Sequence, residues 1–430
     1  MFRIYSFLLS IGFLVFSPVF FLRRDKYLSG FRERLGDVPE TDPSKGDVVW
    51  LHCVSVGEVN AAKPLVDELR LRYPQKQIVV STTTRTGQEL ARKIFAGQAS
   101  SIFYFPFDFL FSVKKALHRI KPAVVLLMET EIWFNFIREA SCYGSKVAIV
   151  NGRLSERSRS RYELIQGFLL ELFPYIDLAI MQSERDSLRL MSLGMDGLRV
   201  KVSGNLKFDR VTSHADSQLS VALKDRFGLG DVRPVVLAVS THSPEEGMLL
   251  ESLTLLRHRI PDARMILAPR HPQRFEEVVA LVRDAGFKYS VRSKAPTQSD
   301  RDAEVIVMDS IGELGAVYPL GDVVFVGGSL IPHGGQNVLE PALAERAIVS
   351  GPSMHNFAAI VEELLSQDAI VKLESNDPRE YPASLATVFD RLISDVEERT
   401  SMGRKAMAVI EENRGATDRT VESLATVLDR

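Results

Sequence analysis

The stretch Val48-Val-Trp-Leu-His-Cys-Val-Ser-Val-Gly-Glu58 decides the fold class, because an apolar run passes directly into a turn and then a helical pattern. Similar short runs, rich in β-branched residues, recur on both sides of it and are separated by helical patterns. Such alternation is typical of a parallel sheet whose two faces are both covered by helices. We therefore expect an α/β protein built from doubly wound sheets.

Working outward from this stretch, the chain divides into two halves. We expect strands in the first half at residues 48–55, 77–81, 102–107, 123–128, 146–150, 178–181 and 200–203. We expect strands in the second half at residues 234–239, 263–268, 304–308, 323–326 and 347–350. The predicted divisions are an N-terminal segment 1–22, a first domain 23–207, an irregular linker region 208–232, a second domain 233–396 and a C-terminal amphipathic helical stretch 397–430.

The bulk properties agree with two domains and exclude several classes of function. A chain of 430 residues is too long for one ordinary core. A net charge of −2 gives no basic field for nucleic acid. Two distant cysteines form no disulfide framework. The sequence lacks a GxGxxG fingerprint after the first strand, a phosphate-binding GxxxxGK[ST] loop and a GxSxG elbow, and we predict no metal site, interpreting Asp300 and Asp302 as surface residues.

The N-terminal segment departs from this ordinary composition. Ile4–Leu22 contains no charged residue over 19 positions, which just reaches the length of a membrane-spanning helix. The basic residues that follow it are Arg23, Arg24, Lys26, Arg32 and Arg34. A cleaved signal peptide would carry its basic region before the apolar run, so we predict an uncleaved anchor with the rest of the chain in the cytoplasm. Pro18 and the length leave open whether this anchor spans the bilayer or lies in one leaflet.

Carboxylates follow two of the predicted strands in the first half. Glu58 comes at the carboxyl end of the first strand, where it could take a proton from an acceptor hydroxyl, or form a capping box with Ser55. Glu129 and Glu131 end a later strand and suit acid/base or cation-binding work, but could also be solvated or cap the next helix. Lys207 lies near the predicted hinge, where a cation could meet a phosphate or simply be solvated.

Three segments of the second half suit a phosphorylated ligand. Arg270 leaves a strand within Pro269-Arg-His-Pro272 and can bind a phosphate bidentately, although the segment could also be an ordinary loop. Asp309-Ser-Ile-Gly-Glu313 is expected to open a helix whose N–H groups face a ligand, or to supply only an N-cap. The glycine-rich segment 327–340 ends in Asn337 and Glu340, and a glutamate there suits the two hydroxyls of a ribose.

Together these segments resemble the 3-deoxy-D-manno-octulosonic acid (Kdo) transferases, glycosyltransferase family 30. The matching stretches are Phe31-Arg-Glu-Arg-Leu-Gly36, His52-Cys-Val-Ser-Val-Gly-Glu58, Glu129-Thr-Glu-Ile-Trp133, Asn151-Gly-Arg-Leu154, Gly204-Asn-Leu-Lys-Phe-Asp209, Ser240-Thr-His242, Pro269-Arg-His-Pro272, Ile311-Gly-Glu-Leu314, Gly327-Gly-Ser329 and Gly335-Gln-Asn337 through Glu340. They run in order from the anchor to about Phe357. One departure follows His242, where Ser243-Pro-Glu-Glu stands in place of an expected Glu-Gly-Glu-Glu.

The resemblance implies a GT-B fold of two Rossmann-like domains, the first binding the acceptor and the second the CMP-sugar. It implies CMP-Kdo as donor, lipid IVA as acceptor, and inversion without metal or other cofactor. It implies Glu58 as general base, with Glu129 and Lys207 assisting the transition state. The positions that would hold CMP are Pro269, Arg270, Ile311, Gly312, Glu313, Asn337, Val338, Leu339 and Glu340. The implied location is the cytoplasmic side of the inner membrane, in contact with its lipids.

Two other classes of protein would share parts of this pattern. A GT-B sugar-nucleotide epimerase would share the nucleotide segments but needs no membrane anchor. A membrane-tethered two-lobed binding protein would also contain two α/β domains, but it should face the outside and would not need Glu58.

Overall fold

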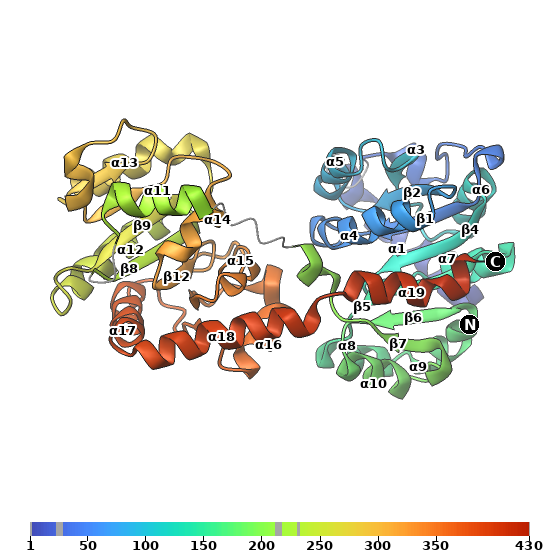
Figure 1. Cartoon of the computed structure of the whole chain (residues 1–430). Helices are drawn as coiled ribbons and strands as arrows, with labels where there is room; N and C mark the ends of the chain where they lie inside the picture. The colour runs from blue at the N-terminus through green and yellow to red at the C-terminus, as the bar shows by residue number, and fades with distance from the viewer. Residues whose placement is uncertain (1, 23–28, 211–216, 230–232, 430) are drawn as a thin grey trace. The chain divides into compact units, whose positions relative to one another are not determined.

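The computed structural model describes residues 2–22, 29–210, 217–229 and 233–429. It forms two compact units, one comprising Met1–Arg210 with Asn413–Arg430 and the other Val211–Glu412 (Figure 1). The chain therefore passes twice between the units. Each unit is an α/β domain with one parallel sheet, which confirms the predicted fold class at this level.

Unit 1 contains a seven-stranded parallel sheet in the order β3-β2-β1-β4-β5-β6-β7. Its strands are β1 Val48–Cys53, β2 Gln77–Thr82, β3 Ser101–Tyr104, β4 Pro122–Met128, β5 Lys146–Gly152, β6 Leu178–Met181 and β7 Val200–Val202. Its helices are α1 Phe2–Leu22, α3 Phe31–Arg34, α4 Val56–Arg72, α5 Arg85–Ile94, α6 Leu110–Ile120, α7 Phe134–Tyr143, α8 Glu156–Glu163, α9 Gln166–Leu172, α10 Glu184–Ser192 and α19 Ala416–Leu428.

Successive residues of β1 enter different cores, as the two-residue period of a strand requires. Trp50 packs with side chains of α6, α7, α9 and α10 on one face. Leu51 packs with side chains of α4, α5 and α19 on the other. Burial on both faces explains why β1 reads as an almost continuous apolar run.

The C-terminal helix α19 completes the second of these faces. Asp209 accepts hydrogen bonds from the backbone N–H groups of Gly415 (2.8 Å) and Thr417 (2.6 Å) at the start of this helix. Gly415 adopts a φ of 77°, which separates α19 from α18, Val396–Asn413. The predicted helical stretch 397–430 is therefore two helices, and the second belongs to unit 1.

Unit 2 repeats the architecture with the strand order β10-β11-β9-β8-β12-β13-β14. Its strands are β8 Val235–Thr241, β9 Arg264–Pro269, β10 Tyr289–Val291, β11 Val305–Val307, β12 Val323–Val326, β13 Ala347–Ser350 and β14 Val371–Lys372. Its other helices are α11 Ser217–Phe227, α12 Glu245–Arg257, α13 Phe275–Asp284, α14 Leu314–Val317, α15 Leu339–Leu343, α16 Ala358–Ser366 and α17 Tyr381–Ser394. The predictions missed β10 and β14, the two short edge strands.

The segment predicted to be an irregular linker contains helix α11, Ser217–Phe227, so the prediction that it is irregular was wrong. Leu223 and Phe227, four residues apart, bury one face of this helix. Arg226 on the same helix forms an ion pair of 2.8 Å with Asp300. Asp300 is consequently buried, which corrects its interpretation as a surface residue.

Helix α1 packs against unit 1. The Tyr5 hydroxyl donates to the Asp108 carboxylate at 2.8 Å, and the Ser6 hydroxyl donates to Asn135 at 3.1 Å. The side chain of Phe2 also packs on the core. Within the described ranges, no helix is both long enough and apolar enough to cross a membrane.

The basic residues after α1 are not all available to a membrane. Arg23, Arg24 and Lys26 lie outside the described residues. Arg34 is buried and donates to the carbonyl oxygens of Ser29 (3.0 Å) and Thr83 (2.6 Å), so it stabilises the fold instead of facing lipid.

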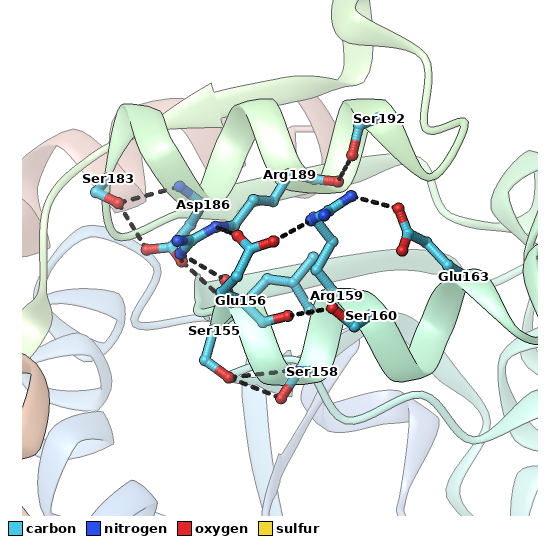
Figure 2. Close-up of polar contacts among 11 residues, drawn as sticks. Ser155, Glu156, Ser158, Arg159, Ser160, Glu163, Ser183, Asp186, Arg189 and Ser192 are labelled. Carbon is cyan, nitrogen blue, oxygen red and sulfur yellow. Dashed lines mark hydrogen bonds and ion pairs between the residues drawn. The ribbon is translucent and has the colours of Figure 1, made fainter.

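A polar network fixes the loop between β5 and α8 (Figure 2). Asp186 accepts a hydrogen bond from the Leu154 N–H at 2.9 Å, and Arg189 donates to the Leu154 carbonyl at 3.0 Å. Glu156 joins α8 to α10 by accepting from Arg189 at 3.1 Å, and it also accepts from Arg159 of its own helix at 2.7 Å. These contacts fix Leu154 in the loop that directly follows β5.

Candidate active site

The candidate residues lie where each doubly wound sheet reverses its winding direction. In unit 1 the chain leaves β1 toward β2 on one side and later places β4 on the other side of β1. Loops after such a pair of strands separate, and ligands bind at this point in doubly wound sheets. Glu58 follows β1 and Glu129 follows β4. In unit 2 the corresponding pair of strands is β8 and β12.

Glu58 is held in place by the turn that it follows. Its side chain is only 6% exposed. One carboxylate oxygen accepts from the Val54 N–H at 2.7 Å, and the other accepts from the Ser55 hydroxyl at 3.1 Å. Ser55 is the N-cap residue of α4, but its side chain makes no capping bond, so the alternative of a capping box with Glu58 is wrong.

The environment of Glu58 favours its neutral form. Burial, and then the charges of the nearby Glu129 and Glu131 carboxylates, raise the pKa of Glu58 to about 8 against the opposing hydrogen bonds from Val54 and Ser55. A carboxyl group with a pKa near the working pH can accept a proton and release it again. Glu58 therefore has the acidity that a general base requires.

Glu129 and Lys207 form an ion pair beside this carboxyl group. The Lys207 Nζ lies 3.5 Å from a Glu129 carboxylate oxygen. Glu129 adopts a φ of 54°, and its N–H donates to the Val150 carbonyl on neighbouring β5. Asn151 accepts from the Leu206 N–H at 3.0 Å and so positions the segment that carries Lys207. The structure brings the two predicted residues together.

Neither carboxylate after β4 caps helix α7. The N-cap residue Trp133 makes no capping bond, and the Asp108 carboxylate instead accepts from the N–H groups of Asn135 (3.1 Å) and Phe136 (2.7 Å). Burial, followed by the charge of Glu129, raises the pKa of Glu131. The cluster thus concentrates three carboxyl groups, of which Glu58 and Glu131 have raised pKa values.

The segment after β9 presents an arginine to solvent. Pro269 ends the strand, and the Arg270 N–H donates to the Thr241 carbonyl at 3.0 Å, which ties the ends of β9 and β8 together. The Arg270 side chain is exposed. Pro272 begins a short 3₁₀ helix, a position that suits proline because its missing N–H would be unpaired there.

The segment after β11 does not open a long helix. α14 starts at Leu314, and neither Asp309 nor Ser310 caps it. Ile311 is 78% exposed and Gly312 adopts a φ of 87°. Glu313 is held by Arg292 at 2.9 Å. The predicted contact therefore falls on an exposed loop and not on a helix end.

Asn337 and Glu340 are joined directly. The Asn337 amide donates to one Glu340 carboxylate oxygen at 2.9 Å, and the Tyr318 hydroxyl donates to the other at 3.0 Å. These two donors fix the orientation of the carboxylate at the start of α15. Val338 and Leu339 between them are buried.

The sequence analysis missed two buried glutamates that organise unit 2. Glu245 accepts hydrogen bonds from the N–H groups of His242, Gly328, Ser329 and Leu330, and so joins the loops after β8 and β12. The Ser243-Pro departure from the family pattern lies in this same loop, directly before Glu245.

Glu246 binds Arg274 through both carboxylate oxygens (2.7 and 3.1 Å) and accepts from the Thr241 hydroxyl at 2.9 Å. It thereby ties the end of β8 to the start of α13. The sequence contains one signal for both glutamates, namely two adjacent acidic residues shortly after a buried strand.

Across the described part of the chain, no group of three or more His, Cys, Asp or Glu side chains could hold a metal ion. Both oxygens of the Asp300 carboxylate are already occupied by Arg226, Ser290 and Thr297. Burial alone would raise its pKa, but these hydrogen bonds hold the pKa of Asp300 at about 2.

Two doubly wound units, with a buried carboxyl group beside a carboxylate–lysine pair, define a two-domain α/β enzyme of the glycosyltransferase class. A family model described as 3-deoxy-D-manno-octulosonic-acid transferase (kdotransferase) matches residues 29–210. The 3-deoxy-D-manno-octulosonic acid transferase of Haemophilus influenzae is 31% identical over 417 residues, covering 97% of this chain and 96% of that protein. That of Bordetella pertussis is 32% identical, covering 87% and 86%. The chain therefore belongs to the family of Kdo transferases and is a glycosyltransferase that acts on Kdo.

Solved structures of more distant proteins share the fold. A glycosyltransferase from Rickettsia africae superposes with a TM-score of 0.55 at 11% identity, covering 89% of this chain and 99% of that one. The UDP-GlcNAc 2-epimerase from Neisseria meningitidis superposes with a TM-score of 0.53 at 13% identity, covering 89% and 100%. At these identities the likeness shows the two-domain fold alone.

Proposed function

We propose that this enzyme transfers Kdo from CMP-Kdo to lipid IVA in lipopolysaccharide core biosynthesis, with inversion and with Glu58 as the general base. The observation that carries this proposal is the Glu58 carboxyl group, which is buried at the switch point of unit 1, is held by two hydrogen bonds and has a pKa near 8. Membership of the Kdo transferase family supports the sugar, and the names of the relatives support transfer.

The proposed chemistry is a single displacement. A glucosamine hydroxyl oxygen of the acceptor attacks the anomeric carbon of Kdo, and Glu58 takes its proton. The bond from the anomeric carbon to the phosphate oxygen breaks, and CMP leaves with that electron pair. The cationic side chains of Lys207 and Arg270 stabilise the negative charge that develops on the phosphate.

A direct assay tests the proposal. The protein is incubated with CMP-Kdo and lipid IVA, and the mass of the lipid product is measured by mass spectrometry. We expect an increase by one or more Kdo residues together with release of CMP. Release of CMP without any change in lipid mass would instead indicate hydrolysis and would contradict lipid IVA as the acceptor.

Transfer should persist in EDTA. The proposed charge stabilisation comes from Lys207 and Arg270, and the Asp300 carboxylate of the D-x-D pattern is committed to Arg226, Ser290 and Thr297. Initial rates with and without EDTA check this expectation. Activity that EDTA abolishes and Mg²⁺ alone restores would contradict it.

We further propose that α1 lies in one leaflet of the inner membrane, on its cytoplasmic side. Its packed face carries Tyr5 and Ser6, whereas Ile4, Phe7, Leu8 and Ile11 are exposed. These four positions follow the spacing i, i+3, i+4 and i+7 and therefore share one helical face. An exposed apolar stripe on a helix suits the boundary between headgroups and acyl chains.

Replacing Phe7 and Leu8 by serine should weaken association with vesicles while leaving the fold intact. These side chains are 65% and 58% exposed, so their loss removes contacts with lipid and not with the core. Sedimentation with anionic vesicles measures the effect.

Tyr5→Phe is the matched control on the packed face. It removes the hydrogen bond to Asp108 and should lower the melting temperature without weakening vesicle binding. Equal vesicle binding by the serine variant and the wild type would contradict a membrane role for this face.

A further inference from the structure

Histidines gather at the switch point of unit 2. His242 follows β8, His271 follows β9, and His333 lies in the loop after β12. The His242 ring is centred 4.4 Å from that of His333 and 5.1 Å from that of His271. We call these three residues the histidine cluster. Ligands of doubly wound sheets bind at such a position.

His242 is the buried member of this cluster. It is 8% exposed, and its Nε2 has no hydrogen-bond partner among the described residues. Buried polar nitrogens are normally paired, so one that faces no protein group calls for an explanation. A bound ligand supplies the missing partner.

The other ring nitrogen determines what kind of ligand group fits. Nδ1 lies 3.0 Å from the Ser240 carbonyl oxygen, which can only accept a hydrogen bond. Nδ1 therefore carries the proton, and in the neutral ring Nε2 presents a lone pair. A group that donates a hydrogen bond, such as a hydroxyl, matches this lone pair, whereas an anion would require the ring to take up a proton.

The surroundings oppose that uptake. Burial, and then the neighbouring imidazoles of His333 and His271, lower the pKa of His242 to about 4. The nearby carboxylates do not reverse this. Glu246 raises the pKa of His242, but only as a smaller contribution, because its charge is already paired with Arg274, and Glu245 is surrounded by backbone N–H groups. The ring consequently stays neutral at physiological pH.

The surrounding loops are built to hold His242 in this orientation. A side chain at Gly327 would place its Cβ 2.5 Å from the Ser240 carbonyl oxygen, so the loop after β12 packs directly on the segment before His242. The His242 N–H donates to Glu245 at 2.9 Å, and the same carboxylate binds the Gly328 N–H at 2.7 Å. The orientation of the ring is thus set by three elements of the fold.

We propose that His242 accepts a hydrogen bond through Nε2 from a hydroxyl group of the nucleotide-sugar donor, and so helps to determine which donor unit 2 binds. This inference rests on the proposed CMP-Kdo donor. The hydroxyl belongs either to the ribose or to the sugar acid, and these two sources are distinguishable because CMP contains only the first.

Isothermal titration of the full chain with CMP and with CMP-Kdo tests this proposal. His242→Asn keeps an amide N–H for the Ser240 carbonyl but removes the acceptor. We expect it to weaken CMP-Kdo binding roughly 5- to 30-fold, as loss of one buried hydrogen bond does. An unchanged CMP affinity would assign the hydroxyl to the sugar acid, and an equal loss for CMP would assign it to the ribose.

Two further variants separate this role from a structural one. His258→Asn, at an exposed position on the far end of α12, should bind both ligands as the wild type does. His242→Gln, which can place an amide oxygen near the position of Nε2, should recover part of the lost affinity. Wild-type affinity for CMP-Kdo in His242→Asn would overturn the proposal.

Protonation provides an independent readout. Titration in two buffers of different ionisation enthalpy should show no proton taken up by His242 when the donor binds. Uptake of about one proton by the wild type but not by His242→Asn would overturn the proposal in favour of an anion. A wild-type chain that binds neither CMP nor CMP-Kdo would overturn the proposed function itself, and this inference with it.

Discussion

Glu58→Gln is expected to fold normally and to lose transfer by about 10²–10⁴-fold, the contribution of a positioned general base. Glutamine has the shape of the neutral carboxyl group. Its carbonyl oxygen can accept from the Val54 N–H, and its amide can donate to the Ser55 hydroxyl, so the turn between β1 and α4 should survive. It cannot take a proton from an acceptor hydroxyl. CMP affinity should stay close to that of the wild type, because the predicted nucleotide residues belong to unit 2.

The pH dependence of the wild type should report the same group. A general base acts in its ionised form, so the transfer rate should rise as the pH increases through about 8. The free energy of unfolding should instead decrease as the pH rises. The folded-state pKa of Glu58 lies above its unfolded value, so the folded chain binds the extra proton and loses stability as the pH rises toward 8.

Glu58→Gln should lack that loss of stability. Its free energy of unfolding relative to the wild type should increase between about pH 5 and pH 8 and then level off, as the linkage of proton binding to folding requires. Thermal unfolding across this range measures the difference. A variant with a lower melting temperature but near wild-type transfer would show that Glu58 only shapes the turn, and the base would then have to be sought at Glu129 or Glu131.

The regular parts of the fold could be predicted because strands buried on both faces leave a clear apolar pattern. Leu178–Met181, Val323–Val326 and Ala347–Ser350 occur with the predicted bounds. The edge strands Tyr289–Val291 and Val371–Lys372 are too short to leave such a pattern. α11 was missed because only one narrow face of it is buried, so its sequence reads as polar.

Only those site residues that directly follow a predicted strand could be placed from the sequence. The position of Glu58 and Glu129 after neighbouring strands follows from the alternation of strands and helices. The burial that raises the pKa of Glu58, and the left-handed backbone of Glu129, depend on packing between segments distant in sequence. The role of Glu245 was hidden for the same reason, since three of the N–H groups that it binds lie more than 80 residues away. The ligands that the site residues bind stay predictions.

Lys207→Met should lower transfer by about 10²–10³-fold, the typical cost of removing one group that stabilises developing charge. Its ammonium group lies 3.5 Å from Glu129, and both side chains are partly exposed, so the pair contributes little to stability. The melting temperature should therefore change little. Lys201→Met, at an exposed position on β7, is the matched control and should retain wild-type activity.

A double-mutant cycle with Glu129→Gln separates two ways in which Lys207 could act. If Lys207 only neutralises Glu129, the double variant should be as active as Glu129→Gln and faster than Lys207→Met, because the ammonium group then has nothing left to neutralise. If Lys207 also meets the leaving phosphate, the double variant should stay as slow as Lys207→Met or become slower. The charge of Glu129 already raises the pKa of Glu58, and in Lys207→Met this charge is unpaired and acts more strongly. The transfer rate of Lys207→Met should therefore rise at a higher pH than that of the wild type. We expect the double variant to be at least as slow as Lys207→Met, together with this shift to higher pH. Wild-type rates in Lys207→Met would exclude both neutralisation of Glu129 and contact with the phosphate as roles of Lys207.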